Sequence, residues 1–186
     1  PQVSVSLRDM HTHTCVDIHS ALLGQFQSYN IAAAACMGLH AGVPIAKIQA
    51  AIEAYVPDNN RSQVIEWGTN TVILDAYNAN PSSMRVAIES LQQMSVTSKT
   101  TILGDMLELG DDSLHEHQEI VELLKVSNFQ SVFLVGEEFQ KTTNSFSSFA
   151  NTNELNNWLQ SSPITDSTIL LKGSRGIRLE NLKAEL

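Results

Sequence analysis

The residues best suited to chemistry lie in positions 75–81, directly after the apolar run of residues 71–74. They supply a carboxylate, a phenol and two carboxamides, from Asp75, Tyr77, Asn78 and Asn80. A carboxylate just past a strand can accept hydrogen bonds from both hydroxyls of a ribose, and paired carboxamides suit a peptide. The same residues could instead cap a following helix and stabilise the turn, so residue chemistry alone leaves two interpretations open.

Two other predicted strands end in polar residues. Residues 103–110 place Asp105 and Glu108 between glycines, where paired carboxylates could serve acid–base or cation chemistry. A glycine-bracketed turn with solvated acids is the locally preferred interpretation. In residues 171–176, Lys172, Ser174 and Arg175 form a loop suited to an anion, although a solvated basic turn is equally consistent. This loop matches neither the Walker phosphate-binding loop nor the dinucleotide fingerprint G-x-G-x-x-G.

Histidine spacing gives a weaker signal. His11, His13 and His19 fall on a predicted strand, where alternate residues share a face and could bind a metal ion. His115 and His117 fall on a predicted helix, where residues i and i+2 point apart. Because no cysteine or acidic cluster completes either group, we predict no metal site.

Composition excludes several classes of function. The formal net charge of −9 argues against nonspecific binding to nucleic acid or to an anionic membrane, but not against a nucleotide. No apolar run approaches about 18 residues, so we expect no membrane insertion. Cys15 and Cys36 have small or apolar neighbours, which predicts buried free thiols in a reducing cytoplasm. The chain starts inside a strand-like pattern without an initiator methionine, so we expect a piece of a longer protein.

The sequence predicts two successive arrangements of strands and helices that would position these residues. Strands are predicted around residues 3–7 and 14–18, followed by helices over 28–41 and from Pro44, with a polar segment at 57–60. Beyond it, strands alternate with helices. The strands are predicted at 64–67, 71–74, 100–103, 131–135 and 168–171, and the helices from Pro81, from a capping box Ser113-x-x-Glu116 and after Asn153. We predict a mobile loop over residues 140–153.

This alternation predicts an α/β domain with a mostly parallel sheet flanked by helices. In such a sheet the loops at the carboxyl ends of the strands meet at one edge, which is where ligands bind. Residues 75–81, 103–110 and 171–176 should therefore lie close together. The predicted boundary separates residues 1–62 from residues 63–186.

Taken in order, these three segments resemble the signatures of the Mur ligase family. Residues 75–84 resemble its Asp-x-Tyr-Asn-Ala-Asn-Pro-x-Ser-Met pattern, residues 104–110 its next signature and residues 172–175 its last. Upstream, residues 24–35 resemble the end of the family's central ATPase domain. There Phe26 and Gln27 replace a His-Asn pair, while Asn30 keeps the following asparagine.

The resemblance implies a Rossmann-like C-terminal ligase domain over residues 63–186, preceded by a remnant of the central ATP-binding domain over residues 1–62. It implies roles residue by residue. Asn30 would face adenine, Arg61 the ATP phosphates and Asp75 the ribose. The acceptor side would be lined by Tyr77, Asn78, Asn80, Lys172, Ser174 and Arg175.

The implied reaction is ATP-dependent amide formation between UDP-N-acetylmuramoyl-tripeptide and D-alanyl-D-alanine, through an acyl phosphate and with Mg²⁺. It belongs to peptidoglycan precursor synthesis in the bacterial cytoplasm, and we expect a monomer with a hinge over residues 57–61. The sequence contains no Gly-Lys-Thr/Ser loop, and the family's Mg²⁺ ligands lie mostly upstream, so this chain alone should not ligate. Two alternatives stay open: a binding module of the same fold without catalysis, and a related Mur or folylpolyglutamate-type ligase.

Overall fold

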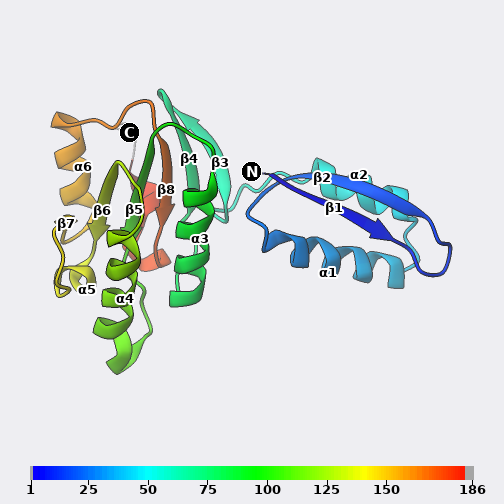
Figure 1. Cartoon of the computed structure of the whole chain (residues 1–186), viewed down its shortest axis with the longest axis horizontal. Helices are drawn as coiled ribbons and strands as arrows, with labels where there is room; N and C mark the ends of the chain where they lie inside the picture. Colours follow the sequence, from blue (N-terminus) through cyan, green and yellow to red (C-terminus); the bar gives the residue numbers. More distant parts are fainter. Residues whose placement is uncertain (1, 183–186) are drawn as a thin grey trace. The chain divides into compact units, whose positions relative to one another are not determined.

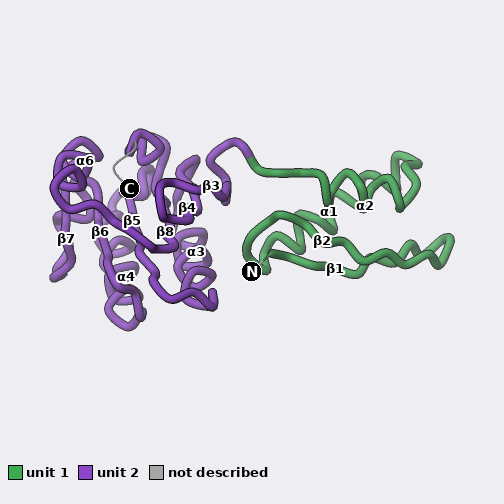
Figure 2. The backbone as a smooth tube through the Cα atoms, turned by 90° about the horizontal axis from the view of Figure 1, so that it is seen from above, with its two compact units in different colours: residues 1–57 green, residues 58–186 purple. Residues whose placement is uncertain are grey.

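The computed structural model describes residues 2–182 of the 186-residue chain. The chain divides into two compact units, residues 1–57 and residues 58–186 (Figure 2). Each unit has its own buried apolar residues.

The first unit pairs a two-stranded antiparallel sheet with two helices. Its elements are β1 (Gln2–Arg8), β2 (Cys15–Leu23), α1 (Gln27–His40) and α2 (Ile45–Ala54). Val3, Ile18, Leu22 and Ile31 are buried together, so one face of the hairpin packs against α1. The predicted strands and helices of this unit are confirmed.

The prediction of buried thiols is wrong, because Cys15 and Cys36 are both exposed. Cys15 opens β2 on the side of the strand opposite to the buried Ile18. Cys36 directly follows Ala35, which is buried in α1, and therefore turns to the exposed side of the helix. Small neighbours do not distinguish the two faces of such elements.

The second unit is built on a six-stranded sheet with the order β3-β4-β8-β5-β6-β7 (Figure 1). All neighbouring strands are parallel except β3 and β4, which form an antiparallel hairpin. The strands are β3 (Gln63–Trp67), β4 (Asn70–Asp75), β5 (Lys99–Gly104), β6 (Ser131–Val135), β7 (Ser147–Phe149) and β8 (Thr168–Lys172). This architecture confirms the predicted α/β class with a mostly parallel sheet.

Helices cover both faces of this sheet. Up to residue 182, where the described part of this unit ends, the helices are α3 (Pro81–Gln93), α4 (Ser113–Lys125), α5 (Glu137–Gln140) and α6 (Thr152–Ser161). Alternate strand residues such as Val72 and Leu74 pack in one core with Leu155 and Leu159 of α6. The intervening Ile73 is also buried, so both faces of the central strands lie inside the unit. Short 3₁₀ turns follow β5 and β8, namely η1 (Gly110–Asp112), η2 (Arg175–Ile177) and η3 (Leu179–Asn181).

Two local predictions are wrong. The capping box at Ser113 does not form: Asp112 occupies the N-cap position without a side-chain bond, and the Ser113 hydroxyl donates to Glu138 Oε2 at 2.9 Å. Residues 140–153 contain strand β7, which pairs with β6. The Gln118 carboxamide also binds both backbone groups of Thr143, at 2.8 and 3.2 Å. The sequence did not predict β7 because this segment is polar. An edge strand has a neighbour on one side only, so it is less buried than a central strand and need not contain an apolar run.

Candidate functional site

The three polar strand ends meet at one edge of the sheet. Strand β8 lies between β4 and β5, and its last residue, Lys172, is in register with Asp75 of β4 and Leu103 of β5. Because the three strands run parallel, the loops after them leave the sheet side by side. The predicted juxtaposition of these loops is confirmed.

Asp75 lies at this edge of the sheet and bonds to two other segments of the chain. Its Oδ1 accepts a hydrogen bond from the Ser62 backbone N–H at 3.0 Å, and its Oδ2 pairs with Lys172 Nζ at 2.5 Å. The Lys172 side chain is only 3% exposed, against 20% for Asp75. Lys172 Nζ also donates to the Asn78 carbonyl at 3.3 Å. The two charges therefore neutralise each other and tie the loop after β4 to the end of β8.

Tyr77 brings together the two arginines predicted for the site. The Arg61 guanidinium carbon lies 4.0 Å from the centre of the Tyr77 ring, and that of Arg175 lies 5.6 Å from it. All three side chains are exposed. They form a positively charged surface beside the neutralised Asp75–Lys172 pair.

Asn78 and Asn80 organise the turn in which they lie. Asn78 Oδ1 accepts the Ala79 backbone N–H at 2.9 Å. Asn80 is the N-cap of α3, where its Oδ1 accepts from Ser83 N at 2.8 Å and from Ser82 Oγ at 2.9 Å. The capping interpretation of this segment therefore holds, and both asparagines remain exposed.

Replacement of Asn80 by alanine is expected to lower the free energy of unfolding by about 1 kcal/mol, because the first turn of α3 loses its side-chain acceptor. Urea denaturation followed by circular dichroism measures this change. Asn80→Asp keeps the acceptor and should cost much less. Equal losses in both variants would show that the cap is not the cause.

Ser174 is buried and its hydroxyl is used inside the protein. Its Oγ accepts the Leu107 N–H at 2.9 Å and lies 3.5 Å from the Ala79 carbonyl, while its own N–H donates to the Asp105 carbonyl at 3.0 Å. Ser174 thus links the loops after β4, β5 and β8. Gly173 allows this contact, since a Cβ there would lie 2.9 Å from Gly104 Cα.

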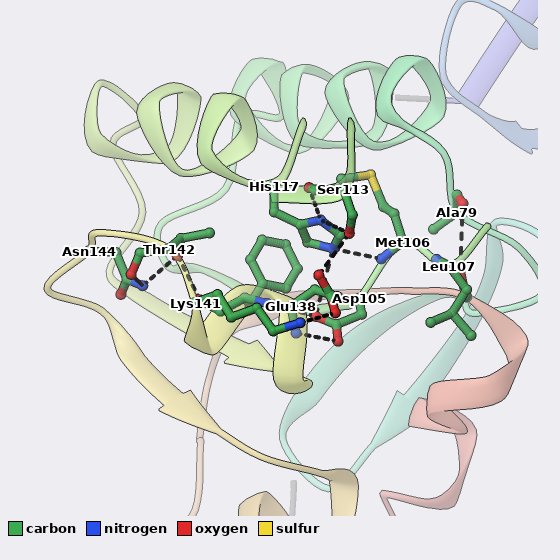
Figure 3. Close-up of polar contacts among 12 residues, drawn as sticks. Ala79, Asp105, Met106, Leu107, Ser113, His117, Glu138, Lys141, Thr142 and Asn144 are labelled. Carbon is green, nitrogen blue, oxygen red and sulfur yellow. Dashed lines mark hydrogen bonds and ion pairs between the residues drawn. The ribbon is translucent and has the colours of Figure 1, made fainter. Parts of the chain in front are cut away.

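Asp105 is buried, so the interpretation of this carboxylate as solvated is wrong. Its two oxygens accept the backbone N–H groups of Glu138 and Phe139 at 2.9 Å each, at the start of α5 (Figure 3). Burial raises the pKa of the Asp105 carboxyl above its usual value, and the two backbone donors reduce that rise. Tertiary folding brings α5 over the end of β5, which local sequence does not reveal.

His117 is fully buried beside Asp105, with its Nε2 3.7 Å from the carboxylate (Figure 3). Nε2 lies 3.0 Å from the Met106 N–H, and Nδ1 lies 2.7 Å from the Ser113 carbonyl. A backbone N–H can only donate and a carbonyl can only accept. The imidazole is therefore neutral, with its proton on Nδ1. Sequence reasoning dismissed this residue as a metal ligand but missed its role in anchoring the loop after β5.

Replacement of His117 by leucine is expected to destabilise the protein by about 2–4 kcal/mol, because the buried Met106 N–H loses its acceptor and the partly buried Ser113 carbonyl loses the imidazole donor. Thermal and urea denaturation measure the change. His115→Leu, on the same helix but exposed, is the matched control and should alter stability by less than about 0.5 kcal/mol. Similar losses in the two variants would contradict the anchoring role.

Asn30 belongs to the first unit. It is exposed on α1, and its Nδ2 donates to Gln27 Oε1 at 2.7 Å. Phe26 folds back over Gly24, where a Cβ would lie 2.4 Å from the ring and where φ is +90°. Phe26 and Gln27 thus support the start of α1 locally.

Among residues 2–182, no three or more His, Cys, Asp and Glu side chains cluster closely enough to hold a metal ion. Within the same residues, no helix has the length and apolar character needed to span a membrane.

An α/β sheet with these three strand-end loops is the arrangement expected for the C-terminal domain of the Mur ligase family. Residues 60–175 match the family model described as "Mur ligase, glutamate ligase domain". The match covers more than half of the chain, so the chain belongs to this family.

The chain is also similar, in sequence and in structure, to known members of the family. The chain is 31% identical over 175 residues to the UDP-N-acetylmuramoyl-tripeptide–D-alanyl-D-alanine ligase of Treponema pallidum, covering 89% of this chain and 38% of that protein. It is 36% identical over 128 residues to the Rickettsia prowazekii protein of the same name, covering 66% and 28%. A crystal structure of MurF from Acinetobacter baumannii superposes with a TM-score of 0.83 at 27% identity, covering 100% and 42%. The chain thus spans less than half the length of these proteins.

Proposed function

We propose that this chain is the C-terminal part of an ATP-dependent ligase that joins D-alanyl-D-alanine to UDP-N-acetylmuramoyl-tripeptide. The observation that carries the proposal is the meeting of three family signatures at one edge of a parallel sheet. The names of the relatives at 31% and 36% identity support this choice of substrates. In a bacterial cell the reaction would serve peptidoglycan precursor synthesis in the cytoplasm, and we propose a monomeric enzyme.

On the nucleotide side, Asp75 would accept the ribose hydroxyls. A carboxylate offers about four acceptor positions, and Ser62 N and Lys172 Nζ use two of them. Arg61, whose guanidinium is exposed, would contact the ATP phosphates, and Asn30 would face the adenine. Lys172 offsets the charge of Asp75, so the carboxylate does not repel the phosphates as strongly as an unpaired one would.

On the acceptor side, exposure separates two groups of residues. Tyr77, Asn78, Asn80 and Arg175 are exposed and would face the peptide substrates. Lys172 and Ser174 are buried and would act by holding the loops in place.

The proposed reaction has two steps. An oxygen of the tripeptide carboxylate attacks the γ-phosphorus of ATP, which releases ADP and leaves an acyl phosphate. The amine of D-alanyl-D-alanine then attacks the acyl carbon and loses a proton, and phosphate departs as the amide forms. Positive groups such as Arg61 would stabilise charge on the transferred phosphoryl group. A hinge over residues 57–61 would let the domain close on its substrates.

Mg²⁺ accompanies ATP in the proposed reaction. The described residues contain no cluster of metal-binding side chains, so we assign no Mg²⁺ ligand to them. Their part is to bind and orient ATP and the peptide substrates.

The test is product formation and phosphate release by the full-length protein that contains this chain, with ATP, Mg²⁺, UDP-N-acetylmuramoyl-tripeptide and D-alanyl-D-alanine. Turnover should require the dipeptide, with single amino acids or folate giving none. The chain alone should release no phosphate, because it contains no Gly-Lys-Thr/Ser loop. Turnover of folate by the full-length protein would favour a folylpolyglutamate-type ligase. Nucleotide binding without any turnover would favour a binding module.

A further inference from the structure

Tyr77 lies where two exposed cations from distant segments converge. Arg61 comes from the segment before β3, and Arg175 opens η2 after β8. Their guanidinium carbons lie 4.0 and 5.6 Å from the same ring centre. An exposed arginine in water samples many rotamers, and a stacked aromatic ring reduces that freedom.

The backbone around Arg61 is held in an uncommon conformation. Asn60 and Ser62, on either side of it, have φ angles of 59° and 50°, in the left-handed region that non-glycine residues rarely adopt. The Ser62 N–H donates to Asp75 Oδ1 at 3.0 Å, which fixes this turn against the end of β4. The base of the Arg61 side chain is thereby immobilised, and the Tyr77 ring contacts its far end.

The base of Arg175 is fixed as well. The Ser174 N–H donates to the Asp105 carbonyl, and the Ser174 hydroxyl binds the loop after β5. The Arg175 guanidinium is exposed and approaches the Tyr77 ring less closely than Arg61 does. Both arginines thus have anchored backbones and share one aromatic surface.

We propose that Tyr77 is a positioning residue: its ring holds Arg61 and, more weakly, Arg175 in their working orientations. This role deepens the proposed function and rests on it, because Arg61 is the residue proposed to contact the ATP phosphates. The ring provides the contact, so phenylalanine should replace tyrosine without loss. The shorter distance predicts that removal of the ring affects the ATP side more than the acceptor side.

The first test uses the 186-residue chain and no substrate. Proton NMR should show the Arg61 side-chain methylene signals shifted upfield by the Tyr77 ring current. Tyr77→Leu should abolish this shift, and Tyr77→Phe should retain it. Tyr55→Leu, which removes an exposed tyrosine outside the site, is the control and should leave the shift unchanged. Absence of the shift in the unaltered chain would overturn the proposal, whatever the enzyme activity.

The second test uses steady-state kinetics of the full-length ligase. Tyr77→Leu should raise the KM for ATP about three- to tenfold, the range expected when one cation–π contact is lost. The KM for D-alanyl-D-alanine should change less, and Tyr77→Phe should restore both. In an Arg61→Met background, Tyr77→Leu should add less than about a twofold change in the KM for ATP.

The kinetic results distinguish failure of the positioning role from failure of the proposed function. A Tyr77→Phe enzyme as impaired as Tyr77→Leu would overturn the positioning role and indicate direct contact through the hydroxyl. Full multiplication of the Tyr77→Leu and Arg61→Met effects would overturn it too. If the unaltered full-length protein does not ligate, the proposed function fails, while the ring-current result still decides whether Tyr77 orders Arg61.

Discussion

Replacing Gly136 by alanine is expected to lower the free energy of unfolding by about 3 kcal/mol or more, and to prevent folding if the protein is marginally stable. Gly136 has φ 130° and ψ 163°, a region that is essentially restricted to glycine. A Cβ there would lie 2.2 Å from Cγ and from Oδ2 of Asp105. The carboxylate would have to move and release the N–H groups of Glu138 and Phe139. Urea denaturation measures the loss.

A matched glycine separates the steric effect from the backbone effect. Gly110 has φ 58°, and a Cβ there would meet nothing within 4 Å. Gly110→Ala should therefore cost only about 1–2 kcal/mol, the penalty for a left-handed residue. The double variant Asp105→Ala/Gly136→Ala should also lose little more than Asp105→Ala plus the backbone penalty. Equal costs for the two glycine variants would show that the close approach to Asp105 is unimportant.

This edge of the sheet could be predicted from the sequence, because strand-like and helix-like periodicities alternate and turn residues separate them. Alternating strands and helices indicate a parallel sheet, and a parallel sheet gathers the loops at its carboxyl edge. Asn80-Pro81 also indicates a helix start, because asparagine is a good N-cap and proline suits the first helical position. These predictions depend on local spacing only, and the structure confirms them.

What the sequence could not predict depends on contacts between distant residues. The spacing of His117 from His115 excluded a metal site but did not indicate that His117 is the buried acceptor for Met106. Asp105 appeared solvated because nothing nearby in the sequence covers it; α5, more than thirty residues later, supplies its donors. Such contacts join segments far apart in the chain, and residue spacing along one sequence does not show which segments will meet.

Arg61 and Ser62 illustrate the same limit within the proposed site. Family resemblance drew attention to Arg61, but nothing in the sequence indicated that Ser62 binds Asp75 or that Tyr77 stacks on Arg61. Strand β3 turns back on β4 through the Gly68–Thr69 hairpin, which brings the start of β3 beside the end of β4. Hairpin geometry therefore determines which side chains surround the carboxylate.

The Asp75–Lys172 pair gives the second large prediction. Asp75→Asn is expected to cost about 3 kcal/mol, because the Lys172 ammonium, 3% exposed, loses its counter-charge and water cannot replace it. Lys172→Met should cost less, about 1–3 kcal/mol, because Asp75 is 20% exposed and keeps the Ser62 N–H. The double variant should be more stable than the sum of the two losses predicts, by about 1 kcal/mol or more.

An exposed ion pair on the same unit is the control for these three variants. Arg85 and Glu119 lie 3.3 Å apart, with side chains 38% and 46% exposed. Arg85→Met should cost no more than about 1 kcal/mol, and that cost should shrink at high salt, because exposed pairs are screened. The cost of Asp75→Asn should change little with salt. Urea denaturation at low and high salt measures both, and a salt-sensitive Asp75→Asn loss would mean that water reaches the pair. A salt-insensitive loss would mean that the ammonium and the carboxylate proposed to hold the ribose are shielded from solvent ions before any nucleotide binds.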